Sequence, residues 1–169
     1  MDVNGLLEDG LSRVHEHVHD VVDGLEVDAL LTAPEPGANP IGWLVWHLTR
    51  VQDHHISELL ERDQVWDDDW SRRFGLATAL PNDVGYGHSP EEVAAVRPES
   101  GQALVDYYEA VEARTLELLA TLTPEMLGES VDRRWDPPVT MGVRLISVLD
   151  DDIQHAGQAA YVKGLLSRR

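Results

Sequence analysis

Cysteine is absent from the 169-residue chain. Its absence excludes disulfide bonds, zinc sites built from thiolates, and any nucleophilic thiol that belongs to the protein itself. Any thiol chemistry would therefore require a thiol that a cosubstrate supplies.

Basic residues are few: 13 Lys and Arg residues stand against 31 Asp and Glu residues, for a formal charge of −18. This charge would repel nucleic acid phosphates and anionic lipid headgroups, so neither a nucleic acid nor a membrane is an expected partner. The sequence also lacks an apolar run of the roughly 18 residues that span a bilayer, and its first residues do not resemble a signal peptide. The expected location is the cytoplasm.

Aromatic residues make up only 6% of the chain, whereas hydrophobic residues reach 43%. This composition fits helices that pack through leucine, valine and alanine, and the length suits one domain over residues 1–169. Apolar residues recur at spacings of three and four in four segments, at about 3–31, 40–62, 98–123 and from 140 onward. With no convincing strand pattern, the sequence predicts an all-α four-helix bundle.

Signals between these segments predict how the helices begin and how they are joined. Asn39 and Pro40 are expected to supply the N-cap and the first-turn proline of the second helix. Asp63 to His88 lose the helical periodicity and predict a long loop. Ser89-Pro90-Glu91-Glu92 is typical of a capping box and predicts a short helix before the third long one.

Acidic residues and a histidine interrupt the apolar pattern of the fourth helix. Burial of Asp150, Asp151 and Asp152 would be unfavourable unless they were paired or bound a metal ion. Asp151 and His155 are four residues apart and share a helix face, and His47 lies beside the apolar stripe of the second helix. Two imidazoles and one carboxylate would leave coordination positions open, as in catalytic metal sites. The alternative is a hydrogen-bonded core histidine and a solvated acidic face.

Two sequence motifs resemble a known family. Asn39-Pro40-Ile41-Gly42-Trp43-Leu44-Val45-Trp46-His47-Leu48 resembles the second-helix signature of the DinB-like superfamily, which includes the mycothiol-dependent maleylpyruvate isomerases. Asp151, His155, Gly157 and Gln158 fall where that group has an acidic residue followed by His-x-Gly-His. The resemblance covers nearly the whole chain, and it implies a DinB-like bundle with its long loop after the second helix.

The resemblance implies a divalent metal held by His47, His155 and a third group from the fourth helix. In the isomerase-like branch the third group is a carboxylate four residues before the histidine, here Asp151. Another branch uses a second histidine, which is replaced by Gln158 in this sequence, so Asp151 is the preferred ligand and Gln158 is expected beside it. Asp152 and Gln158 also stay open as the third ligand. Zinc is the expected metal, with nickel, iron and manganese as alternatives.

The resemblance also implies a function: a metal-dependent thiol S-transferase or isomerase that uses mycothiol or bacillithiol as cosubstrate and acts on an electrophilic small molecule. The ion would lower the pKa of the thiol, and the loop from Asp63 to His88 would cover the pocket. The sequence does not identify further catalytic residues. A homodimer is implied as well. The alternatives are a bundle that binds a metal and a small ligand without turnover, and a structural dimerisation domain without metal.

A second histidine motif lies in the first helix. His15-Glu16-His17-Val18-His19 matches the zinc-protease pattern of two histidines four apart with a glutamate between them. The extended pattern's downstream glycine and third histidine are replaced by Val22 and Leu25, so a solvated flank of a core helix is expected instead.

Further residues have either a pocket role or an ordinary structural one. His54 lies two turns after His47, about 10 Å along the helix axis, so one ion cannot bind both. It is expected at the surface or beside the pocket. The aromatic candidates for pocket walls, which could equally be core residues, are Trp43, Trp46, Tyr107 and Tyr161.

Overall fold

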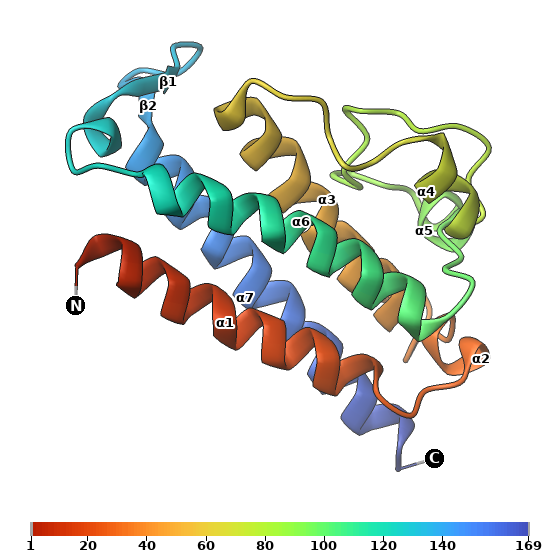
Figure 1. Ribbon diagram of the computed structural model, residues 1–169. Helices are drawn as coiled ribbons and strands as arrows, with labels where there is room; N and C mark the ends of the chain where they lie inside the picture. Colours follow the sequence, from red (N-terminus) through yellow and green to blue (C-terminus); the bar gives the residue numbers. More distant parts are fainter. Residues whose placement is uncertain (1, 169) are drawn as a thin grey trace.

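Four long helices form a bundle in the computed structural model, which describes residues 2–168 (Figure 1). They are α1 (Val3–Val22), α3 (Ile41–Leu60), α6 (Gly101–Thr121) and α7 (Met141–Leu166). The predicted all-α four-helix bundle is confirmed. No helix within residues 2–168 is long and apolar enough to cross a membrane.

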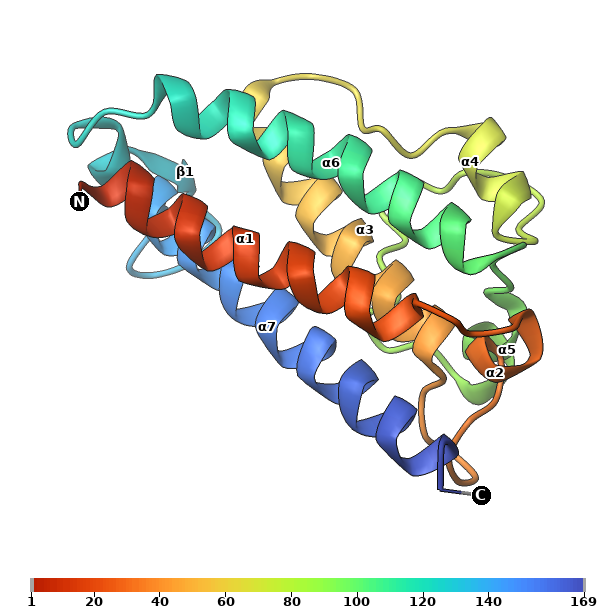
Figure 2. The same ribbon diagram turned by 60° about the horizontal axis from the view of Figure 1, so that its bottom comes forward.

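Each long helix packs mainly against two others. α7 lies beside α3 and α1, and α6 lies beside the same two helices, so α1 and α3 are diagonal to each other (Figures 1 and 2). Buried side chains that include Val14, Leu44, Leu104 and Ala156 meet between them. The α3–α7 pair and the α1–α6 pair are therefore opposite edges of the bundle.

Three predicted helix boundaries are wrong. The first helix ends at Val22 rather than near residue 31, because Gly24 adopts a φ of 69°, which ends a helix; a separate short helix, α2 (Val27–Leu30), follows. Pro40, not Asn39, is the N-cap of α3, and no side chain caps that helix. The third long helix begins after Ser100, whose hydroxyl accepts from the Ala103 N–H at 3.0 Å.

The segment between α3 and α6 contains two short helices. α5 (Pro90–Ala95) has the predicted capping box, in which Ser89 and Glu92 each accept from the other's backbone N–H. α4 (Asp68–Arg73) lies inside the predicted loop and was not expected. Its N-cap Asp67 accepts from two backbone N–H groups, which explains why so short a helix forms.

A small hairpin separates α6 from α7. The turn η1 (Met126–Gly128) leads into β1 (Ser130–Asp132), which pairs antiparallel with β2 (Val139–Thr140). The expectation of no strand is wrong here, because five strand residues give too short a pattern to recognise. Thr140 then caps α7 by accepting from the Val143 N–H.

Candidate metal centre

The structure brings His47 of α3 together with Asp151 and His155 of α7. One ligand atom from each side chain lies within 4.8 Å of the other two. The imidazole centroids are 4.6 Å apart with the rings nearly perpendicular at 82°, and His155 Nε2 lies 3.6 Å from Asp151 Oδ1. The α3–α7 edge thus places the three residues singled out in the sequence within reach of a single ion.

Hydrogen bonds fix the orientation of both imidazoles. His47 Nδ1 donates to the backbone carbonyl of Val84, and His155 Nδ1 donates to Gln158 Oε1 at 2.9 Å. A carbonyl oxygen can only accept, so each Nδ1 carries the proton and each Nε2 keeps a lone pair for a cation. Gln158 thus contacts a candidate ligand rather than replacing one.

Burial keeps His47 neutral. Its side chain is almost completely buried, and this loss of solvent lowers its pKa to about 4. The nearby imidazoles of His155 and His88 lower the pKa further, while the hydrogen bond to Val84 opposes them. The neutral imidazole that results is the form that binds metal ions.

Asp151 has an unsatisfied oxygen. Its Oδ2 is buried and has no hydrogen-bond partner within residues 2–168. Burial raises the pKa of this carboxyl, whereas His155 acts to lower it. A divalent cation would satisfy this oxygen and remove the penalty of burying it. Two imidazole nitrogens and one carboxylate oxygen suit zinc and its neighbours in the first transition row, so these residues fit such an ion.

A loop residue without a side chain permits the close packing around His47. Gly85 has a φ of 91°, and a Cβ there would lie 2.9 Å from His47 Nδ1. On the helix side, Trp43 stacks on the His47 ring with 4.6 Å between centroids. The Trp43 indole donates to His88 Nδ1, and His88 Nε2 in turn donates to Asp83 at 2.8 Å. The loop at Gly85 and the indole of Trp43 thus both pack closely against the His47 imidazole.

Asp152 lies on a different face of α7 from Asp151. It is fully buried, neither carboxylate oxygen has a hydrogen-bond partner within residues 2–168, and burial raises its pKa well above the usual value. Burial raises the pKa of the nearby Tyr108 phenol on α6, and the interaction with Asp152 raises it further. Asp152 is absent from the group formed by His47, Asp151 and His155.

The other residues singled out in the sequence lie away from this centre or only border it. His54 contacts Gln64, while Tyr161 is exposed. Trp46 is buried and lies beside Gly85.

Comparison with known proteins identifies the family. A family model described as mycothiol S-transferase matches residues 6–167. The chain belongs to the mycothiol S-transferase family. Among solved structures, a conserved protein from Enterococcus faecalis is 36% identical, covers 100% of this chain over 99% of its own, and superimposes with a TM-score of 0.89. These findings confirm the DinB-like resemblance, whereas no curated protein matches the chain.

Two hollows border the candidate centre of this mycothiol S-transferase family member. One of about 400 Å³ reaches His88, and one of about 530 Å³ reaches Gln158 and Tyr161. Both are lined by Ala38 and Asn39, so the segment between α2 and α3 separates them. Neither hollow is lined by the three candidate ligands, but Gln158 of the second hollow contacts His155, and His88 of the first hollow lies close enough to His47 to lower its pKa.

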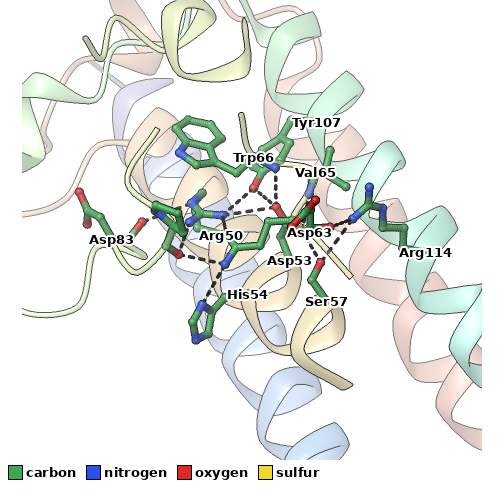
Figure 3. A network of polar contacts seen from close by, with 12 residues as sticks. Arg50, Asp53, His54, Ser57, Asp63, Val65, Trp66, Asp83, Tyr107 and Arg114 are labelled. Carbon is green, nitrogen blue, oxygen red and sulfur yellow. Dashed lines mark hydrogen bonds and ion pairs between the residues drawn. The ribbon is translucent and has the colours of Figure 1, made fainter. Parts of the chain in front are cut away.

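Sequence reasoning missed a buried polar network in this family member (Figure 3). Arg50 Nη1 donates to Gln64 Oε1 at 2.9 Å and to the Tyr107 hydroxyl at 3.2 Å, and Nη2 donates to the Pro81 carbonyl at 3.0 Å. The Tyr107 hydroxyl donates to Asp53 at 2.8 Å. Tyr107 is therefore part of the network rather than a pocket wall. The sequence feature that could have revealed this network is the spacing of Arg50 and Asp53, three residues apart in the largely apolar helix α3.

Proposed function

We propose that this protein is a divalent-metal-dependent thiol S-transferase. It would join a low-molecular-weight thiol, mycothiol or the related bacillithiol, to an electrophilic small molecule. The observation that carries the proposal is the convergence of His47, Asp151 and His155, with both histidines oriented to offer Nε2. The family description supports a thiol as cosubstrate and favours transfer over isomerisation.

The residues present have distinct roles in this reaction. His47, Asp151 and His155 would hold the ion, whose Lewis acidity would lower the pKa of a thiol bound beside them. The thiol proton passes to solvent, a sulfur lone pair forms the bond to the electrophilic carbon, and the leaving group departs with its bonding electrons. Because the chain has no cysteine, the sulfur must come from the cosubstrate.

Metal content tests the centre directly. The full chain, purified without a metal-affinity tag, is compared with His47→Ala and His155→Ala by elemental analysis, and circular dichroism confirms that each variant folds. His17→Ala is the matched control, because His17 is exposed on α1. Each of the first two variants should lose about one ion per chain relative to the unmodified protein, and the control should lose none. Equal metal content in all four proteins would refute the centre.

Turnover tests the chemistry. Metal-loaded protein is mixed with monochlorobimane and, in separate reactions, mycothiol, bacillithiol or glutathione. Conjugation should exceed the uncatalysed rate with one of these thiols, fall to background in His47→Ala and persist in His17→Ala. Thermal stabilisation by a thiol without product would instead support a bundle that binds its ligand without turnover.

A further inference from the structure

A second cluster of metal-ligating side chains lies at the opposite edge of the bundle, between α1 and α6 (Figure 2). His15 and His19 are one turn apart on α1, and their rings stack with 4.3 Å between centroids and 29° between planes. Glu109 of α6 faces them, and one ligand atom from each of these three residues lies within 4.8 Å of the other two. Two histidines at this spacing on a helix can bind one ion together.

One nitrogen of this cluster, His19 Nε2, is shielded from solvent and makes no hydrogen bond within residues 2–168, although the His19 side chain as a whole is 38% exposed. This nitrogen lies 3.1 Å from Glu109 Oε1, but the two atoms are not aligned for a hydrogen bond. A shielded nitrogen without a hydrogen bond is unfavourable, and a cation between this nitrogen and the carboxylate would satisfy both.

A neighbouring carboxylate orients the other imidazole. His15 Nδ1 lies 2.8 Å from Glu112 Oε2, so this nitrogen carries a proton that it donates to the carboxylate. The lone pair of His15 is then left on Nε2. Carboxylates hold metal-binding histidines in this way, because the hydrogen bond fixes the ring and makes the free nitrogen a stronger donor.

Ion pairing between the two helices is the simpler arrangement of these side chains, with His15 beside Glu112 and His19 beside Glu109. A cation held between the two stacked rings and Glu109 would use the same three ligand groups, so the experiment must separate the two arrangements.

We propose that α1 and α6 hold a second divalent cation, of the zinc, nickel or copper class, through His15, His19 and Glu109. Imidazole ligands favour these ions over magnesium and calcium. Because its ligands come from two helices, the ion would clamp α1 to α6. The site shares no residue with the centre at His47, so either proposal can fail without the other.

Another group, His54, His55 and Glu58, also has its ligand atoms close together. However, the Arg144 guanidinium lies 3.1 Å from His55 Nδ1 and 3.2 Å from His55 Nε2. A cation already faces both ring nitrogens there, which disfavours a metal ion.

Zinc titration in a chain that lacks the first centre tests the proposal. The untagged full-length His47→Ala/His155→Ala protein is titrated with Zn²⁺ by calorimetry, and about one ion per chain is expected to bind. Adding His19→Gln should weaken binding by more than about tenfold. Adding His17→Gln, on the same helix but exposed, should leave the affinity unchanged. Circular dichroism confirms that each variant is folded.

Thermal unfolding gives a second readout. Zn²⁺ should raise the melting temperature of the double variant and of its His17→Gln derivative, and it should not raise that of its His19→Gln derivative. The proposal is overturned if the double variant binds no Zn²⁺, which would leave two His–Glu ion pairs. It is equally overturned if binding survives His19→Gln and is lost on His55→Gln, which would assign the ion to the group at His54.

Discussion

Arg50 and Asp53, one turn apart on α3, form an ion pair whose side chains are both fully buried, with 3.3 Å between Nη1 and Oδ2. Burial of charge is unfavourable unless hydrogen bonds replace the lost water. The segment after α3 supplies such bonds: the N–H groups of Val65 and Trp66 donate to Asp53 at 2.9 Å, and the Pro81 carbonyl accepts from Arg50. The pair therefore fastens two parts of this segment to α3.

The contacts of Arg50 with this segment also affect the candidate metal centre. Arg50 Nε donates to the Asp83 carbonyl at 3.3 Å, and the next residue, Val84, offers its carbonyl to His47. The ion pair lies one turn after His47 on the same helix. The orientation of the His47 imidazole thus depends on a loop position that Arg50 holds.

We predict that Asp53→Ala lowers the free energy of unfolding by about 3 to 5 kcal/mol, because it leaves the Arg50 guanidinium buried without its carboxylate. Urea denaturation measures the change. Glu117→Ala is the matched control, since it removes the acidic partner of Arg62 from an ion pair with both side chains more than half exposed. That change should be below about 1 kcal/mol. Equal losses in the two variants would show that the buried pair has no special role.

Gly85→Ala should disturb the surroundings of His47. The new Cβ would lie 2.9 Å from His47 Nδ1 and 3.0 Å from the Trp43 ring, in addition to the strain of a φ of 91°. Gly87 also has a positive φ, of 76°, but a Cβ there meets no atom of the described residues within 4 Å. The Gly85 variant should therefore be less stable than Gly87→Ala by roughly 1 to 3 kcal/mol in urea denaturation. Similar losses would mean that backbone strain alone decides the outcome.

His55 makes stability depend on pH. Burial, followed by the charge of Arg144, lowers its pKa from 6.5 to about 4. Between these values the unfolded chain binds a proton that the folded chain does not, so the contribution of His55 is complete above pH 6.5 and is lost as the pH falls towards 4. The unmodified protein should lose up to about 3 kcal/mol over this window relative to His55→Gln. Parallel curves for the two proteins in urea denaturation at each pH would contradict the prediction.

The four helices and the shared face of Asp151 and His155 could be predicted from helical periodicity, whereas the meeting of these two residues with His47 was implied by the resemblance to the DinB-like superfamily. Asp151 and His155 share a face whatever they pack against, and His47 lies beside the apolar stripe of its own helix. Periodicity was less reliable for single positions on α7. Ile153 is 47% exposed, whereas the neighbouring Asp152 is fully buried. Which face of α7 is buried depends on how this helix packs against α1 and α3. A pattern of apolar residues alone would instead place isoleucine in the core and aspartate at the surface.

The loop contacts could not be predicted from the sequence. Val84 and Gly85 lie 37 and 38 residues after His47 and meet it from a segment without periodicity, and no local signal shows where such a segment packs. The break after Val22 was missed for a related reason: Leu25 continues the apolar spacing, although Gly24 has already turned the backbone away from the helix.

Gln158 should determine how firmly His155 binds an ion. Its Oε1 accepts from His155 Nδ1 at 2.9 Å, which fixes the tautomer that leaves Nε2 free. Loss of such an orienting partner weakens metal binding by about 10- to 100-fold, and we predict a loss of this size for Gln158→Ala in a zinc titration. Gln154→Ala is the control, because Gln154 lies one turn earlier and donates to Asp150 instead. Gln158→Glu, which keeps an acceptor for Nδ1, should retain the affinity. If Gln158→Ala and Gln154→Ala bind Zn²⁺ equally well, the ring of His155 is held by helix packing alone.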